Sequence, residues 1–174
     1  MGYDFNEHKH RYAVWTAARA VQRSFTTTEI IKKAIESSSL RQFSESSEKI
    51  DRDRFDQFQI EWCDSIIKSF EKNNITCSYG RAAKIVAVYL KTAVILPGLG
   101  NSVNAMVIHP PIDRILLTRI SKEEEFKDLK KTNWTSLKIE DYWHLVGRLK
   151  KHQLGFNWKL EQLWKPEKET KQVE

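Results

Sequence analysis

Residues 79–94, YGRAAKIVAVYLKTAV, decide how this chain of 174 residues folds. Small and aliphatic side chains fall on nearly every face of a helix drawn through this stretch. A helix that is apolar all round is buried inside a protein, whereas a surface helix keeps one polar side. We therefore expect Tyr79–Val94 to form a central helix, with the rest of the chain packed around it.

Upstream, residues 8–24 predict an amphipathic helix. The apolar positions recur every three or four residues, which is the spacing of one helix face. They are Tyr12, Val14, Trp15, Ala18 and Val21, while Arg11, Arg19 and Arg23 take the other side. This pattern predicts a helix with one apolar face against the core and one basic face toward solvent.

Start and stop signals outline further helices. TTTE supplies a hydroxyl N-cap for a helix that begins near Glu29, and Asp51 starts a long helix that ends at Asn73-Asn74. An aromatic stripe marks the core side of that long helix: Phe55, Phe58, Trp62, Ile66 and Phe70.

The second half of the chain continues in the same way. Pro110-Pro111 presets a helix over residues 112–120, and SKEEEF (121–126) resembles a capping box before a short charged helix. IEDYWHLVGRLKK (139–151) is amphipathic, with Tyr142, Leu145, Val146 and Leu149 along one side. The serine-rich residues 37–49 lack periodicity and are expected to form a surface loop.

The fold expected from these patterns is all-α. One domain of about seven or eight helices should span residues 1–164, and the polar residues 165–174 should form a disordered tail. Hydrophobic content of 40%, charge of 30% and only six glycines are typical of a globular protein built from long regular elements.

The charge and the cysteine content limit the classes of partner and cofactor that this chain is expected to bind. The chain holds 29 Lys and Arg against 23 Asp and Glu, a net charge of +6 that suits a polyanionic partner such as nucleic acid. No apolar run is long enough to span a membrane, and no targeting segment is recognisable, so we expect a cytoplasmic monomer. Cys63 and Cys77 lack the spacing of a zinc or redox motif, so no metal or cofactor is expected.

Lys84 and Asp113 are the residues most suited to chemistry. Both are expected near the starts of helices joined by a Pro/Gly loop, and a helix N-terminus favours an ionised carboxylate. Such an aspartate can stabilise an oxocarbenium-like sugar or activate water, and a lysine among apolar residues can attack a sugar C1′. A purely structural interpretation is also open: Asp113 caps its helix, and Lys84 extends out of the core.

AAKIVAVYLK, the following loop and PPIDRIL together resemble the helix-hairpin-helix DNA glycosylases, a superfamily that includes endonuclease III and the 8-oxoguanine and adenine glycosylases. A second similarity lies in YAVWTAARAVQRSFTTTEIIKKAIE, which resembles the early helix, Gln-containing turn and next helix of that family. The resemblance implies that Gly80 lies at the hairpin-like turn, that Lys84 is the lyase nucleophile and that Asp113 is the catalytic aspartate. An alternative register puts Ala82 at the lysine position, which would make the enzyme monofunctional.

The resemblance also implies roles in binding the nucleic acid. Gln22 would enter the space left by a flipped base, with Arg23 beside the DNA backbone. Tyr79 and His109 are candidates for stacking on or hydrogen-bonding the extruded base. Glu29 is a candidate second acid/base group, and Arg81 and Arg114 are candidate phosphate contacts. Trp134, in the stretch NWTS, is expected to be the most exposed tryptophan.

These features predict a DNA N-glycosylase that flips and excises a damaged or modified base from double-stranded DNA. Strand nicking by an AP-lyase step depends on the role of Lys84, and the setting is either repair or defence against modified phage DNA. The alternative from a different class is a non-catalytic helical module that binds nucleic acid or a protein.

Overall fold

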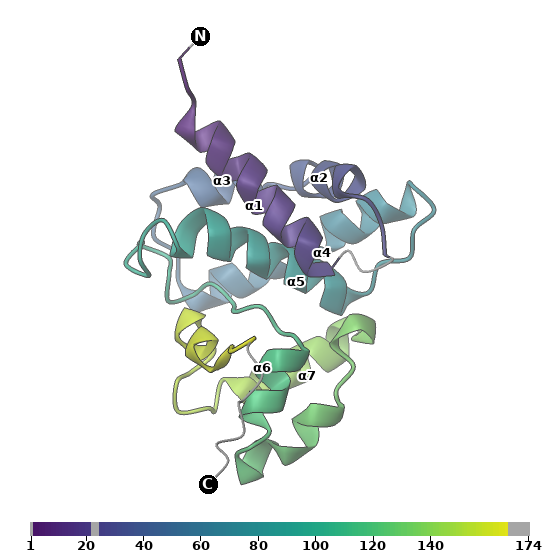
Figure 1. Ribbon diagram of the computed structural model, residues 1–174, viewed down its shortest axis with the longest axis vertical. Helices are drawn as coiled ribbons and strands as arrows, with labels where there is room; N and C mark the ends of the chain where they lie inside the picture. Colours follow the sequence, from purple (N-terminus) through teal and green to yellow (C-terminus); the bar gives the residue numbers. More distant parts are fainter. Residues whose placement is uncertain (1, 22–24, 167–174) are drawn as a thin grey trace, which may run out of the picture.

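The computed structural model describes residues 2–21 and 25–166, and this part of the chain is helical without any β-strand (Figure 1). Seven α-helices, one π-helical turn and three 3-10 helices follow one another here: α1 (Phe5–Val21), α2 (Thr28–Glu36), α3 (Leu40–Glu45), α4 (Arg52–Glu71), α5 (Tyr79–Leu90), η1 (Lys91–Ile95), α6 (Arg114–Ile120), η2 (Glu124–Lys131), η3 (Trp134–Ser136), α7 (Ile139–Leu149) and η4 (Trp158–Leu163). The prediction of an all-α domain is confirmed.

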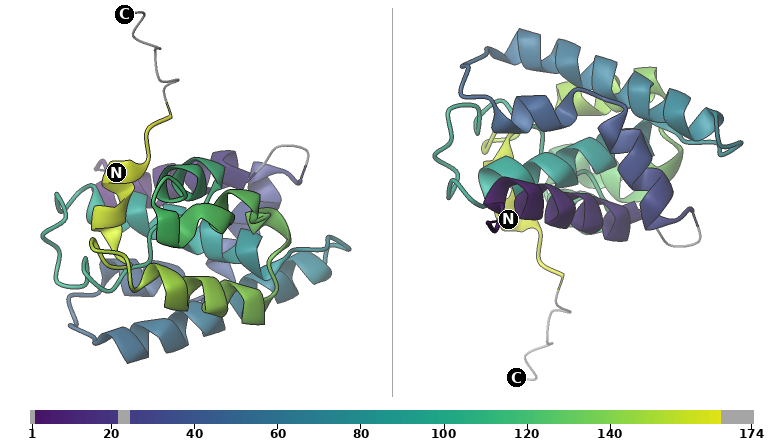
Figure 2. Two further views of the ribbon diagram at one scale, coloured as in Figure 1. Left: turned by 90° about the horizontal axis from the view of Figure 1, so that it is seen from below. Right: turned by 90° about the horizontal axis from the view of Figure 1, so that it is seen from above.

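Helix α5 is the centre of the molecule, as its sequence predicts. It lies between α1 and α4, which cover its two sides (Figure 2), and most of its residues are buried. The π-helical turn η1 continues α5 to Ile95. The later elements α6, α7 and η4 form the other half of the molecule, below α5 in Figure 1.

Glycine allows the first turn of α5 to approach the segment before α7. A Cβ atom at Gly80 would lie 2.0 Å from the carbonyl oxygen of Trp134, and the Gly80 amide donates to the Leu137 carbonyl at 3.1 Å. Ser78 caps the helix by accepting from the Arg81 amide, and its hydroxyl donates to the Thr135 carbonyl. Gly80 therefore lies within α5 as a close-contact residue and not in a hairpin turn before it.

Several sequence-based start signals and stripes are confirmed. Thr27 caps α2, Asp51 caps α4 and Asp113 caps α6, each through its side-chain oxygen. The aromatic stripe of α4 is buried apart from the half-buried Phe58, and all four apolar residues named for α7 are buried.

Three predictions were wrong. The serine-rich stretch contains α3, because Leu40 is fully buried and Phe43 packs against Trp62, with ring centroids 4.9 Å apart. The helix after α6 is a 3-10 helix whose N-cap is Glu123, without a capping box from Ser121. On α1, Tyr12 and Trp15 are exposed, because the short side chains of Ala13 and Ala17 form the face against α5 instead.

No helix in the described ranges is long and apolar enough to cross a membrane. Of the predicted tail, residues 165–174, the structure describes only Lys165 and Pro166.

Candidate functional site

Lys84 and Asp113, 29 positions apart in the sequence, meet in the interior. The Lys84 Nζ lies 3.1 Å from the Asp113 Oδ2, and the two side chains are only 8% and 12% exposed. Lys84 comes from the second turn of α5, and Asp113 is the N-cap of α6. A buried ion pair is retained only where the geometry and further hydrogen bonds compensate for lost hydration, so this contact is a specific feature of the fold.

Both oxygens of the Asp113 carboxylate are held in place. Oδ1 accepts from the amide of Leu116 at 2.9 Å, which caps α6. Oδ2 accepts from the Trp164 indole Nε1 at 2.9 Å as well as from Lys84. The capping role that the sequence allowed for Asp113 is thus present together with the pairing to Lys84.

Trp134 covers the other partner of the pair. The Lys84 Nζ lies 4.4 Å from the centroid of its ring, which is a favourable cation–π distance. Trp134 was expected to be exposed, but it is half-buried because η3 docks on the first turn of α5. Trp15 on α1 is the exposed tryptophan.

A second lysine and carboxylate lie beside the first pair. Lys91 is seven residues after Lys84 and therefore on the same side of the central helix. It forms an ion pair with Glu161 of η4, and its Nζ lies 5.0 Å from the centroid of the Trp164 ring. Trp164 consequently contacts one member of each pair.

Burial raises the pKa of the Glu161 carboxyl group, and the positive charge of Lys91 only partly opposes this effect. Its Oε1 is buried without a hydrogen-bond partner among the described residues. Glu161 is therefore a second acidic group in this region with a proton affinity above the ordinary value.

These two pairs border one cavity of about 410 Å³ between α1, α5, η4 and the start of α6. Its lining comprises Thr16, Arg19, Ala20, Lys84, Val88, Lys91, Thr92, Leu96, Pro111, Asp113, Glu161 and Trp164. We call this cavity the lysine–aspartate cavity. It is open to solvent on one side and presents both charged groups and apolar walls, the composition typical of a small-molecule or base pocket.

The structure does not bring the expected base-reading residues to this cavity. Tyr79 is buried and its hydroxyl accepts from the Trp143 indole at 3.1 Å. It lines a separate cavity of about 500 Å³ beside Cys77 and Leu137. Burial raises the pKa of the Cys77 thiol to about 12, so this second cavity holds no reactive thiolate at neutral pH.

His109 is an interior residue as well. It lies 2.9 Å from the Asp56 carboxylate and 3.3 Å from the Tyr142 hydroxyl, and Lys150 donates to the other Asp56 oxygen at 2.8 Å. Burial lowers the pKa of His109 although Asp56 opposes this shift. The group links α4 to α7 and does not line the lysine–aspartate cavity.

The remaining candidates lie on other surfaces. Glu29 is 64% exposed on α2 and pairs with Lys33. The Arg81 guanidinium lies 4.4 Å from the centroid of the Phe25 ring, and Arg114 donates to the Lys130 carbonyl. Gln22 and Arg23 lie outside the described residues.

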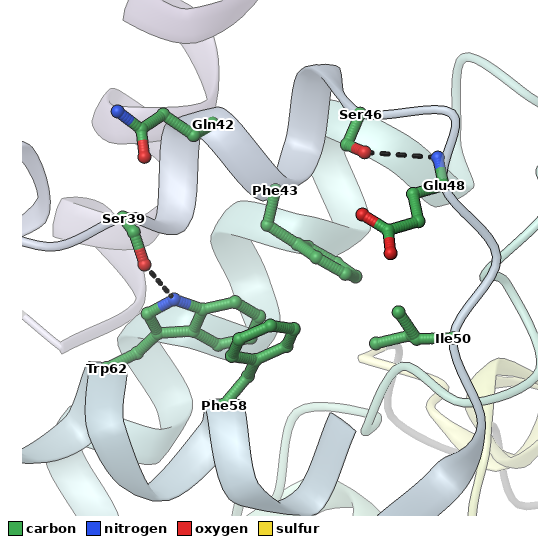
Figure 3. A pocket seen from close by; sticks show the side chains of 8 residues that line it. All are labelled: Ser39, Gln42, Phe43, Ser46, Glu48, Ile50, Phe58 and Trp62. Atoms are coloured by element: carbon green, nitrogen blue, oxygen red, sulfur yellow. Dashed lines mark hydrogen bonds between the residues drawn. The ribbon is translucent and has the colours of Figure 1, made fainter. Parts of the chain in front are cut away.

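A further cavity, of about 300 Å³, lies between α3 and α4 (Figure 3). Phe43, Phe58 and Trp62 form its wall, and Trp62 donates to the Ser39 hydroxyl at 3.0 Å. Phe58 stacks on Trp62 on one side and carries the Arg54 guanidinium, 4.2 Å from its centroid. Because these contacts already cover the aromatic faces, this cavity is a weaker candidate for binding a planar ligand.

Sequence reasoning missed Lys91, Glu161 and Trp164. The recurrence of lysine after seven residues in a helix that is otherwise largely apolar was an available signal, because positions seven apart share one helix side. Nothing in the sequence of the short helix η4 indicates that Glu161 and Trp164 reach this cavity. Among the described residues, no group of three or more metal-binding side chains comes together.

Comparison with protein-family models, with curated proteins and with solved structures found no match to this chain.

Proposed function

We propose that this protein is a DNA N-glycosylase whose reaction takes place in the lysine–aspartate cavity. The observation that carries the proposal is the 3.1 Å contact between Lys84 and Asp113 at the edge of this cavity. These are the two residues that the resemblance to helix-hairpin-helix glycosylases pairs. The proposed partner is double-stranded DNA, bound by a cytoplasmic monomer, and the proposed setting is repair or defence against modified phage DNA.

Asp113 has the properties that the reaction requires. In hydrolysis the water oxygen bonds to the sugar C1′, and the C1′–N bond breaks with its electron pair passing to the base, which takes up a proton. A fixed carboxylate stabilises the cationic sugar of the transition state and orients the water. A carboxylate has about four acceptor positions, and three are occupied by Leu116, Lys84 and Trp164. One position is left for water.

Lys84 acts in this proposal as an electrostatic partner of Asp113. The Lys84 Nζ donates to the Asp113 carboxylate at 3.1 Å, so in this proposal the amine holds Asp113 in place and is not directed at the sugar. A single cleavage of the glycosidic bond without strand nicking is therefore the expected reaction. Glu161 is the second acidic group of the cavity, and burial raises its pKa although its ion pair with Lys91 opposes this shift.

The non-catalytic module is a second candidate, and one observation favours it. Three donors among the described residues bond to the Asp113 carboxylate, and together these bonds join α5, α6 and the residue that follows η4. The same network would serve as a structural clamp in a protein that binds nucleic acid without turning it over.

The test uses labelled duplexes that each contain one damaged or modified base, with alkali treatment after incubation to reveal abasic sites. Asp113→Asn keeps the size of the side chain and removes its charge. We expect cleavage to fall by about a hundredfold or more while DNA binding is retained. Asp64→Asn on α4, which removes an exposed carboxylate paired with Lys68, is the matched control and should cleave normally.

Borohydride trapping tests the lysine separately. The proposal expects no covalent adduct, and an adduct that disappears in Lys84→Gln would assign Lys84 as a nucleophile instead. Absence of cleavage across the panel, with salt-dependent binding intact, would favour the non-catalytic module. Thermal unfolding of each variant establishes that lost cleavage is not lost folding.

A further inference from the structure

Tyr12 and Trp15 form an exposed aromatic pair on α1. Their rings are stacked, with centroids 5.8 Å apart and planes 21° apart, and the residues are 54% and 50% exposed. The opposite face of α1, with Ala13, Ala17 and Ala18, carries the packing against the core. Two exposed aromatic side chains side by side offer ring faces on which a planar ligand can stack.

The aromatic pair leads directly to the lysine–aspartate cavity. Residues four apart lie one above the other on a helix, so Thr16 follows Tyr12 and Arg19 follows Trp15. Thr16 and Arg19 both line the cavity with Lys84 and Asp113. The Thr16 hydroxyl is 2.9 Å from that of Thr92, which fixes α1 against the central helix at this point. The aromatic pair and the cavity are thus parts of one surface.

The charge of this helix is positive. The helix contains Lys9, Arg11 and Arg19 against one acidic residue, Glu7. Arg11 is paired with Glu7 at 2.7 Å, whereas Arg19 is exposed and makes no hydrogen bond or ion pair with any residue that the structure describes. An exposed arginine one turn beyond a pair of aromatic rings suits a strand that has both bases and phosphates.

We propose that Tyr12 and Trp15 are a stacking platform for an unpaired DNA strand that enters the lysine–aspartate cavity. Aromatic rings stack on bases of any sequence, and flanking basic residues contact the backbone. Where the duplex is opened beside the extruded nucleotide, the unpaired neighbouring base would lie against Trp15, and Arg19 would contact the phosphate between the two nucleotides. That the strand continues from the platform into the cavity rests on the proposed glycosylase function, whereas binding of the strand to the platform does not.

The test measures fluorescence anisotropy of a labelled oligothymidine strand and of a fully paired duplex of equal length, with Asp113→Asn as the background. We expect binding of the single strand to depend on Tyr12 and Trp15, and binding of the fully paired duplex, whose bases are not free to stack on the rings, to be independent of them. Tyr12→Ala and Trp15→Ala should each weaken single-strand binding about tenfold, and Trp15→Phe should retain most of it. Ile139→Ala on α7, which truncates another exposed apolar side chain, should bind like the parent.

A salt titration addresses Arg19. Arg19→Gln should reduce the slope of log affinity against log salt concentration by about 0.7, the value for one lost phosphate contact to a single strand. Unchanged single-strand binding in both alanine variants would overturn the proposal. If single-strand binding depends on Tyr12 and Trp15 but the protein cleaves no base, the stacking platform is supported and the glycosylase function is contradicted.

Discussion

The Asp113 side chain combines two tasks that sequence reasoning treated as alternatives. One oxygen caps α6 and the other receives Lys84 and Trp164. Because the cap holds the carboxylate in the lining of the lysine–aspartate cavity, the same bond would also orient the group for the proposed reaction. Asparagine retains a side-chain oxygen that can cap the helix, but it leaves the buried Lys84 without its carboxylate partner, so Asp113→Asn should also lower the stability of the fold.

His109 provides a prediction about pH. Burial lowers its pKa, so the folded protein keeps the imidazole neutral at a pH where the unfolded chain takes up a proton. Burial also raises the pKa of Asp56, but hydrogen bonds from His109 and Lys150 outweigh this and hold it below its usual value. Both shifts make the unfolded state bind more protons, so stability should fall as the pH decreases from about 7 to about 5 and further below.

Thermal unfolding across this range checks the prediction. We expect the melting temperature to decrease by a few degrees between about pH 7 and about pH 5, and His109→Gln should flatten this dependence. His144→Gln, at an exposed position on α7, is the matched control. An unchanged pH profile in His109→Gln would show that His109 does not carry the effect.

Helix α5 determines the arrangement of the other elements. Its small side chains allow α1 and α4 to approach closely, and its first turn holds η3 through Gly80 and Ser78. That contact brings the Trp134 ring over Lys84. The element that forms the core therefore also positions the aromatic cover of the site.

Gly80→Ala tests this contact. A Cβ atom 2.0 Å from the Trp134 carbonyl oxygen forces the backbone of η3 to move, and we expect a loss of about 2 kcal/mol or more in the free energy of unfolding. Gly147→Ala on α7 is the control, because nothing lies within 4 Å of its added Cβ, and it should be neutral or slightly stabilising. Urea denaturation of both variants compares them, and equal stability would contradict the close-contact role of Gly80.

The site is assembled only in the complete molecule. Its residues come from α1, the central helix, the start of α6 and η4, which are distant in the sequence (Figure 1). Leu160 of η4 is fully buried, and the Gly100 loop approaches so closely that an added Cβ would lie 2.7 Å from the Trp158 ring. The last helical turn is therefore part of the core.

This architecture predicts a single cooperative unfolding transition. Urea denaturation followed by circular dichroism and by tryptophan fluorescence should give the same midpoint, because the helices and the indole contacts are lost together. Trp164→Phe removes the indole hydrogen bond to Asp113, so the difference between its unfolding midpoint and that of the parent gives the contribution of this bond to stability. An earlier fluorescence transition that disappears in this variant would show that η4 detaches before the rest of the molecule.

The sequence by itself determined the all-α class, the central helix 79–94, the caps at Thr27, Asp51 and Asp113, and the pairing candidates Lys84 and Asp113. The helices and caps depend on residues within a few turns of each other, whose periodicity and capping chemistry are local, whereas Lys84 and Asp113, 29 positions apart, were paired through the resemblance to a known family. The tertiary structure decided that Tyr79 and His109 are interior residues, that Tyr12 and Trp15 face solvent, and that Glu161 and Trp164 complete the cavity. Such outcomes depend on which face each helix turns toward a distant neighbour, and local patterns do not specify that choice.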